Sequence, residues 1–237
     1  MPAAQAIHDP MVIDLSRLAP IALAMALGGG LPAAHAEAGR GDACTFGAFV
    51  EEHDSAGLNV RSGPDPKATV IGKLPPIWVS KQDNLQERVE VEVVEARNGW
   101  FRIRRAEDFT RMSGRPARPT FDGEGWVSGT RLSVKTQALR GRASPSASSA
   151  SIFRSANGDP LDSDALMEAS RPVDCKGDWV QLEFNERRLP KDIHSTLQIS
   201  AQARKGSPPG RFRVWVNQIC GIQETTCDGR GLEEGTR

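Results

Sequence analysis

Residues 58–64 read Leu-Asn-Val-Arg-Ser-Gly-Pro, and a diverged version of this stretch, Leu-Arg-Gly-Arg-Ala-Ser-Pro, follows at 139–145. In each half, two tryptophans follow the opening motif. The middle tryptophan comes directly after a predicted turn, and the closing tryptophan comes directly before a valine. These tryptophans are Trp100, Trp126, Trp179 and Trp215. The opening motifs lie 81 residues apart, the middle tryptophans 79 and the closing tryptophans 89. Because duplicated folds tolerate changes of loop length, this spacing predicts two tandem copies of one small domain.

The first 36 residues are typical of a secretory signal peptide. Residues 18–31 are apolar or small apart from one proline, and the stretch is too short to span a bilayer. Ala-His-Ala at 34–36 fits the small-x-small pattern of a cleavage site. We therefore predict cleavage after Ala36 and a mature protein that is periplasmic or secreted, without a stable membrane span. The sequence leaves open whether Met1 or Met11 starts the precursor.

The charge balance excludes nucleic acid as an expected partner. The whole chain has 30 basic and 30 acidic side chains, and removal of residues 1–36 leaves 29 and 28, a net charge of +1. Such a chain lacks the strong positive field that draws proteins to nucleic acid or to anionic membranes.

All four cysteines lie in the predicted mature chain, at Cys44, Cys175, Cys220 and Cys227. An even number of cysteines in an exported protein predicts two disulfides. Three pairings are possible. An extended strand between Cys220 and Cys227 would carry their Cα atoms beyond disulfide reach, so the sequence leaves the connectivity open.

The mature chain reads as a series of short strands, with little helical periodicity. Val-Glu-Val-Glu-Val at 89–93 alternates with period two and leads through Asn98-Gly99 to Trp-Phe-Arg-Ile at 100–103, which predicts a hairpin. The second copy has Lys-Gly-Asp at 176–178 in the equivalent place. Further short β-prone pieces occur at 58–60, 69–71, 125–127 and 212–216. Strands this short favour a small barrel.

Each copy carries a charged, loop-like insertion, at 104–122 and at 185–211. The second insertion holds Ile193, Leu197 and Ile199, which suit either a turn of amphipathic helix or an extra strand, and the sequence does not decide between them. The predicted organisation is a signal peptide at 1–36, a first domain at 44–137, a second at 138–227 and a disordered polar tail at 228–237.

These motifs resemble the bacterial SH3-like (SH3b) family. In the first copy the resemblance rests on the motif at 58–64, on Gly72 and Leu74, and on the Gly-Trp pairs at 99–100 and 125–126. The second copy is more diverged and keeps Leu139, Arg142, Ser144, Pro145, Trp179, Trp215 and Val216. The resemblance implies an all-β fold of two tandem SH3-like β-barrels with loop insertions. It also implies binding of cell-wall material, peptides or envelope proteins, without catalysis.

Candidate ligand contacts are the five tryptophans and two arginines. An indole offers a broad face and one hydrogen-bond donor, but Trp100, Trp126, Trp179 and Trp215 stand beside alternating apolar residues, which favours packing over ligand contact. Trp78 follows Pro-Pro-Ile in an apparent loop and is the best candidate for an exposed contact. Arg61 and Arg142 occupy equivalent places before a turn. Each could bind a carboxylate, although a bond to a nearby carbonyl is the interpretation we favour.

An enzyme is not expected. After removal of residues 1–36 the histidines are His53 and His194, one in each copy, and the sequence has no metal-ligand spacing and no phosphate-binding glycine loop. We therefore predict no catalytic residue, no metal site and no cofactor.

The predicted function is recognition of cell-wall peptide or glycan, that is peptidoglycan, or of other envelope components. An alternative is a structural or regulatory partner of one envelope protein that binds through the second domain. The alternative predicts an exposed apolar patch formed by Leu189, Ile193, Leu197 and Ile199.

Overall fold

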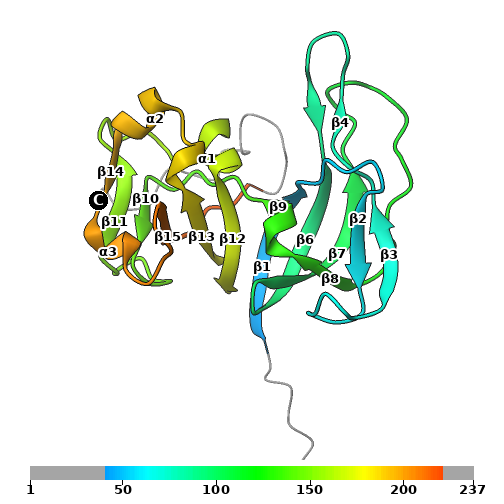
Figure 1. The fold of residues 1–237 in the computed structure, drawn as a ribbon, viewed down its shortest axis with the longest axis horizontal. Helices are drawn as coiled ribbons and strands as arrows, with labels where there is room; N and C mark the ends of the chain where they lie inside the picture. Colours follow the sequence, from blue (N-terminus) through cyan, green and yellow to red (C-terminus); the bar gives the residue numbers. More distant parts are fainter. Residues whose placement is uncertain (1–40, 221–237) are drawn as a thin grey trace, which may run out of the picture. The chain divides into compact units, whose positions relative to one another are not determined.

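The structure is a computed structural model that describes residues 41–220 (Figure 1). The predicted signal peptide, Cys227 and the predicted tail at 228–237 lie outside the described residues. Residues 41–220 form mainly antiparallel β-sheet with a few short helices. In this part of the chain no helix is long and apolar enough to cross a membrane. The expectation of an all-β chain is confirmed at this level.

The first half of the described chain consists of strands and one 3-10 helix. They are β1 (Asp42–Val50), β2 (Leu58–Arg61), β3 (Val70–Leu74), β4 (Trp78–Val79), β5 (Gln86–Glu87), β6 (Val89–Arg97), β7 (Trp100–Asp108), β8 (Gly125–Ser128), η1 (Gly129–Arg131) and β9 (Leu132–Ser133).

The second half also contains short α-helices. Its elements are β10 (Arg140–Arg142), β11 (Ser151–Ser155), α1 (Asp164–Ala169), β12 (Ser170–Lys176), β13 (Trp179–Asn185), η2 (Glu186–Arg188), α2 (Lys191–Ser195), β14 (Leu197–Ile199), α3 (Ala201–Arg204) and β15 (Arg211–Val216).

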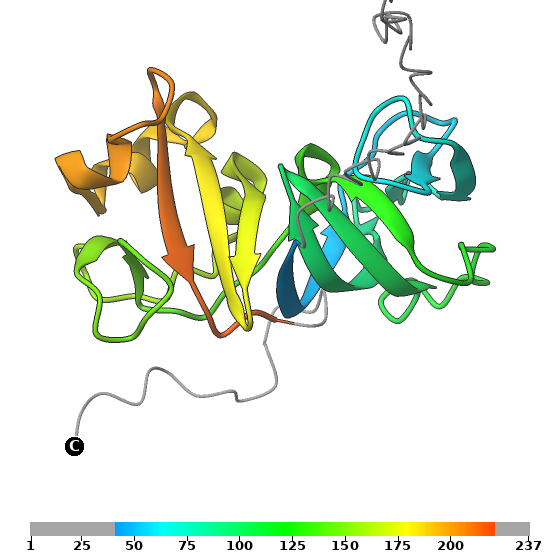
Figure 2. The ribbon, with the colours of Figure 1, turned by 90° about the horizontal axis from the view of Figure 1, so that it is seen from below.

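Five strands occur in the same order in the two large sheets. The first sheet has the order β3-β2-β8-β7-β6-β1-β9, and the second has β12-β13-β15-β10-β11-β14. If each sheet is followed outward from its central hairpin, the two orders match. The first sheet has β6-β7-β8-β2-β3 and the second has β12-β13-β15-β10-β11. Figure 2 shows β15, in orange, beside β13, in yellow. The additions differ, because β1 and β9 extend the first sheet beyond β6 whereas β14 extends the second beyond β11.

The turns that follow the two opening motifs are closed by equivalent backbone hydrogen bonds. The backbone N–H of Ser62 donates to the carbonyl of Thr69 at 2.9 Å, and the N–H of Ala143 donates to Ala150 at 3.0 Å. Both pairs are separated by seven residues. The sequence similarity between 58–64 and 139–145 thus reflects the same local backbone structure.

The predicted central hairpin is present in both halves. Asn98 and Gly99 both have positive φ, 52° and 76°, as a tight two-residue turn between β6 and β7 requires. In the second half Gly177, with φ 61°, lies in the turn that joins β12 to β13. Glycine adopts this conformation without steric cost, so the two turns reach the same geometry with different residues.

Alternate side chains of the central strands form the core. In the second half the rings of Phe153, Phe184 and Phe212 lie with centroids 4.8 to 5.1 Å apart. In the first half Phe46 and Phe101 pack edge to face at 6.1 Å. Buried apolar side chains of both sheets belong to one continuous cluster. Aromatic burial on this scale is a large source of stability for a small β-domain.

The insertions are more ordered than the sequence indicates. The first begins as a continuation of β7, which runs to Asp108, and the second contains both structures that the sequence left open. Ile193 lies in α2, and Leu197 and Ile199 lie in β14. The predicted exposed patch does not form, because Leu189 is buried and the other three side chains are half-buried, with Leu197 and Ile199 packed against the core.

Candidate binding site

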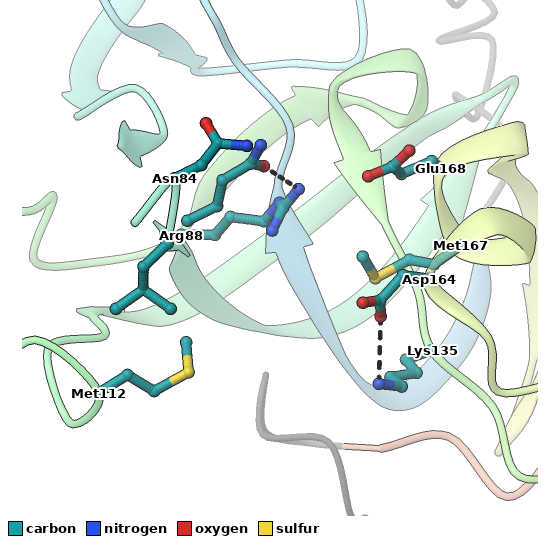
Figure 3. A pocket seen from close by; sticks show the side chains of 9 residues that line it. Asn84, Arg88, Met112, Lys135, Asp164, Met167 and Glu168 are labelled. Atoms are coloured by element: carbon teal, nitrogen blue, oxygen red, sulfur yellow. Dashed lines mark hydrogen bonds and ion pairs between the residues drawn. The ribbon is translucent and has the colours of Figure 1, made fainter. Parts of the chain in front are cut away.

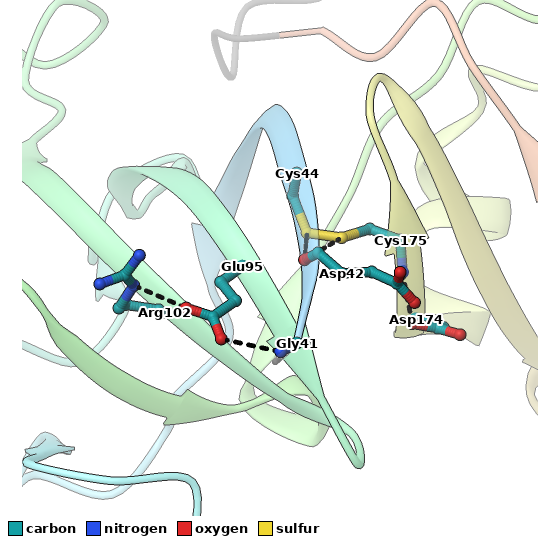
Figure 4. Close-up of a disulfide and its surroundings, with 7 residues drawn as sticks. All are labelled: Gly41, Asp42, Cys44, Glu95, Arg102, Asp174 and Cys175. Atoms are coloured by element: carbon teal, nitrogen blue, oxygen red, sulfur yellow. Dashed lines mark hydrogen bonds and ion pairs between the residues drawn. A yellow bond between two sulfur atoms is a disulfide. The ribbon is translucent and has the colours of Figure 1, made fainter. Parts of the chain in front are cut away.

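A disulfide and two backbone hydrogen bonds join the first sheet to the second. Cys44 of β1 is bonded to Cys175 of β12, with their Cα atoms 5.8 Å apart (Figure 4). Next to the bridge, Thr45 N–H donates to Gly177 at 2.8 Å, and Gly177 N–H donates to Ala43 at 2.8 Å. Native disulfides typically contribute about 2–4 kcal/mol to stability. This bridge settles one pairing. Cys220 is also disulfide-bonded.

The carboxylate of Glu95 holds the beginning of β1 in place beside the disulfide. It accepts a hydrogen bond from the Gly41 N–H at 3.2 Å, and it forms an ion pair with Arg102 at 3.1 Å (Figure 4). On the other side of the bridge, burial and the neighbouring charge of Asp42 raise the pKa of Asp174 despite a bond from the Cys175 N–H. The strand that carries Cys44 is therefore anchored within its own sheet as well as to β12.

Gly129 allows a second close approach between the two sheets. A Cβ atom at this position would lie 2.5 Å from the carbonyl oxygen of Pro172 in β12 and 2.6 Å from the ring of Phe101. These separations are shorter than van der Waals contact, so a side chain at residue 129 would push η1 away from β12. The absence of a side chain keeps the two elements in contact.

A buried ion cluster lies at the same junction. Glu51 accepts hydrogen bonds from Arg88 Nε at 3.1 Å and from Ser133 Oγ at 2.8 Å, and Arg171 lies 3.7 Å away. Burial disfavours the charged carboxylate, but Arg88, Ser133 and Arg171 together outweigh burial and lower the pKa of Glu51. Burial also disfavours the charged form of Arg171 and so lowers its pKa, an effect that the charge of Glu51 partly offsets. The two arginines come from different halves of the chain and share one carboxylate.

A pocket of about 300 Å³ opens beside this cluster (Figure 3). Its walls combine polar, charged and thioether side chains from distant parts of the chain. They are Asn84, Leu85, Gln86, Arg88, Met112, Lys135, Asp164, Met167 and Glu168. The volume is at the lower end of the range for small-molecule sites. The pocket can therefore hold a ligand about the size of one or two amino acids.

Lys135 is the most unusual residue of the pocket. Its side chain is 6% exposed, and its Nζ lies 3.3 Å from Asp164 Oδ1, on a side chain that is 71% exposed. The backbone around Lys135 is fixed, because its carbonyl accepts a bond from the Cys220 N–H at 2.9 Å and Thr136 pairs with Ile219. Lysine is rarely buried to this extent unless it is paired. A single, largely solvated carboxylate is a modest partner for such a charge.

Helix α1 supplies the opposite wall. Ser163 caps it by accepting a hydrogen bond from the Leu166 N–H at 3.3 Å, a contact typically worth about 1 kcal/mol. Asp164, Met167 and Glu168 stand at positions i, i+3 and i+4, which lie on one face of a helix. In Figure 3 the carboxylate of Glu168 is directed toward the wall that carries Arg88.

Each predicted arginine contact makes a local bond. Arg61 Nη1 donates to the carbonyl of Ala68 and Arg142 Nη1 to the carbonyl of Ser149, both at 2.8 Å. This agrees with the interpretation favoured from the sequence. The strand register places Arg61 opposite Trp126 and Arg142 opposite Trp215, so the structure brings these candidates together in equivalent pairs.

The tryptophans are packed to different degrees. Trp126 is buried with the guanidinium of Arg97 at 5.5 Å from its ring centroid, and Trp100, Trp179 and Trp215 are half-buried. Trp78 lies in β4 and not in a loop. It is half-buried, with the guanidinium of Arg115 at 5.1 Å from its ring centroid. Arg115 thus occupies one side of the ring of Trp78, and the role of Trp78 as a ligand contact stays a prediction.

None of the seven predicted contacts lines the pocket. The residues that do line it lack a common motif and come from four separate segments. One signal could have been found, because Ser163-Asp164 precedes a run of good helix formers, which is typical of a helix start. The six residues of α1 are too few to show helical periodicity in the sequence.

The two described histidines each pair with a glutamate. His53 Nε2 lies 3.3 Å from Glu51, and His194 Nε2 lies 3.3 Å from Glu186. Within residues 41–220 no group of three or more His, Cys, Asp or Glu side chains is arranged to hold a metal ion. The serines of the 144–149 turn bond to one another and to the backbone.

Comparisons of the chain with family models, with curated proteins and with solved structures give no match.

Proposed function

We propose that the protein is an exported, non-enzymatic binding protein built from two SH3-like domains, at 44–137 and 138–227, and that it recognises peptidoglycan fragments in the cell envelope. Its binding site is the pocket between Arg88, Lys135 and helix α1, which we call the junction pocket. Two observations support the domain assignment: five strands recur in the same order, and the turns after β2 and β10 share their hydrogen bonds.

The observation that carries the proposal is the pocket itself. It lies where the two halves meet, is lined by charged groups of both signs, by amides and by thioethers, and is bordered by a buried ion cluster that orders its walls. Small-molecule sites commonly combine a concave shape with a few fixed polar groups, and they occur preferentially at domain interfaces.

The disulfide supports export. Disulfides form and persist in oxidising compartments such as the periplasm and the extracellular medium, and the Cys44–Cys175 bridge joins residues 131 positions apart. A binding role agrees with the side chains of the pocket, which offers carboxylates, amides and cations to a polar ligand.

The experiment is co-sedimentation of the oxidised, full-length mature protein with insoluble peptidoglycan. Met112 lines the pocket and is 41% exposed, so Met112→Trp fills the pocket without disturbing the core. Val79 is 44% exposed and does not line the pocket, which makes Val79→Trp the matched control.

We expect the wild type and Val79→Trp to sediment with the wall, and Met112→Trp to remain largely in solution. If the wild type stays in solution, wall binding is wrong. If Met112→Trp sediments like the wild type, the junction pocket is not the site.

A further inference from the structure

We infer that the ligand of the junction pocket is a small zwitterion with a free carboxylate and a free ammonium, as at the two ends of a short peptide. The inference rests on the proposed function, because it takes the junction pocket to be the binding site. It adds the chemistry that the site selects.

The carboxylate is recognised at Lys135. A lysine ammonium has three N–H donors, and among the described residues this Nζ pairs with Asp164. Because the side chain is 94% buried, little water reaches the remaining donors, and a carboxylate in the pocket would accept charge-assisted hydrogen bonds from them. Asp164 is mostly solvated and can stay in place beside the ligand.

The ammonium is recognised at Glu168. Its side chain is exposed at the rim, and its carboxylate is directed across the pocket (Figure 3). Arg171 is the cation nearby, but its guanidinium donates to the carbonyls of Met167 and Glu168 at 3.4 and 3.0 Å and pairs with Glu51. These contacts hold Arg171 against the backbone, which leaves the carboxylate of Glu168 available to a ligand cation.

Both cations of the pocket are paired within the protein, and Glu168 adds a further carboxylate at the rim. Arg88 is matched by Glu51 and Lys135 by Asp164. A ligand with a net negative charge would meet Asp164 and Glu168, and a ligand with a net positive charge would meet Lys135 and Arg88. A zwitterion that lies across the pocket, carboxylate toward Lys135 and ammonium toward Glu168, avoids both repulsions.

The remaining walls suit the middle of a short peptide. Asn84 offers an amide donor and acceptor for a peptide bond, and Gln86 accepts a hydrogen bond from Arg88 at 2.9 Å. Met112 and Met167 present thioethers that adapt to small apolar side chains. The volume of about 300 Å³ limits the enclosed part of the ligand to about two residues.

The test uses alanyl-alanine and two blocked forms of it, the N-acetylated acid and the C-terminal amide. Each is titrated into the ¹⁵N-labelled, oxidised mature protein, and the dissociation constant is taken from backbone amide shifts. We expect free alanyl-alanine to bind about tenfold more tightly than either blocked form, since each loses one charge-assisted contact.

Two variants assign the ends of the ligand. Lys135→Met keeps the shape of the side chain and should weaken free alanyl-alanine and the acetylated form about tenfold, but not the amide. Glu168→Gln should weaken the free dipeptide and the amide, but not the acetylated form. Lys205→Met changes an exposed lysine outside the pocket and should change nothing.

Equal affinity for all three probes, no response to free alanyl-alanine, or wild-type affinities in both pocket variants would overturn the inference. If the wild type still sediments with peptidoglycan and Met112→Trp does not, the proposed function survives that result. If neither assay shows binding, the proposed function fails with it.

Discussion

Asp108 shows how one buried residue orders a whole insertion. Arg115 and Arg118 both donate to its carboxylate, at distances from 2.6 to 3.0 Å, and Arg118 also donates its backbone N–H at 2.7 Å. Arg115 reaches Glu87 as well, at 2.9 Å. A segment that reads as a charged loop is thus tied to the end of β7. Its charges are partners of one another, as burial of charge requires.

Acidification should weaken this cluster. Burial disfavours the charged form of Asp108, but the bonds from Arg115 and Arg118 outweigh burial and hold its pKa far below the ordinary value of 3.8. The unfolded chain takes up the proton near pH 4 and the native chain only at much lower pH, so the stabilisation is present at neutral pH and is lost as the pH falls below about 4.

Asp108→Asn should therefore reduce the free energy of unfolding at pH 7 by about 3 kcal/mol, because it leaves two arginines without a buried counter-charge. The difference from the wild type should narrow as the pH falls to about 3, measured by urea denaturation across the range. Asp178→Asn, on an exposed aspartate, is the control. An equal deficit at both pH values would contradict this account.

Besides the long strand β1, which carries the disulfide, one short element brings the two halves together. The 3-10 helix η1 contacts β12 through Gly129, whereas the long strands β6 and β7 pair within their own sheet. A single turn of backbone thus sets how closely η1 approaches β12.

Gly129→Ala tests this approach. The new methyl group would lie within 2.6 Å of Pro172 and Phe101, so either η1 or β12 must move, at a cost of about 1–3 kcal/mol. Gly63→Ala is the matched control, because its Cβ would lie 3.6 Å from Ala68, an ordinary contact. Thermal denaturation should show a clear loss for the first variant and little change for the second. Equal melting temperatures would show that the contact is unimportant.

Elements with strong local signals were predictable from the sequence. Asn98-Gly99 requires left-handed backbone that few residue pairs adopt, and Val-Glu alternation at 89–93 has one buried face, so the hairpin follows from local chemistry. Helix α1 has a weaker signal, its serine cap, because six residues are too few to show helical periodicity. The contact of Trp78 with Arg115 was not predictable, because the two residues are 37 positions apart.

At the scale of the whole molecule, the two halves share a strand order but differ in what they add. Strand β14 covers the outer edge of β11, whereas within the described residues β3 ends its sheet. Strand β1 and the disulfide connect the first sheet to β12. The pocket takes its lining from both halves, from Asn84 in the first to Glu168 in the second. No motif in a single copy could predict a site assembled from both.

The central claim is that ligand binds between the two halves, and the methionines allow a direct measurement. Of the five methionines, Met112 and Met167 are the two that follow residue 36, and both line the pocket, one from each half (Figure 3). In mature protein labelled with [¹³C-methyl]methionine, soluble peptidoglycan fragments should shift both methyl signals together. Fragments that bind, as shown by calorimetry, while both signals stay in place would contradict the account.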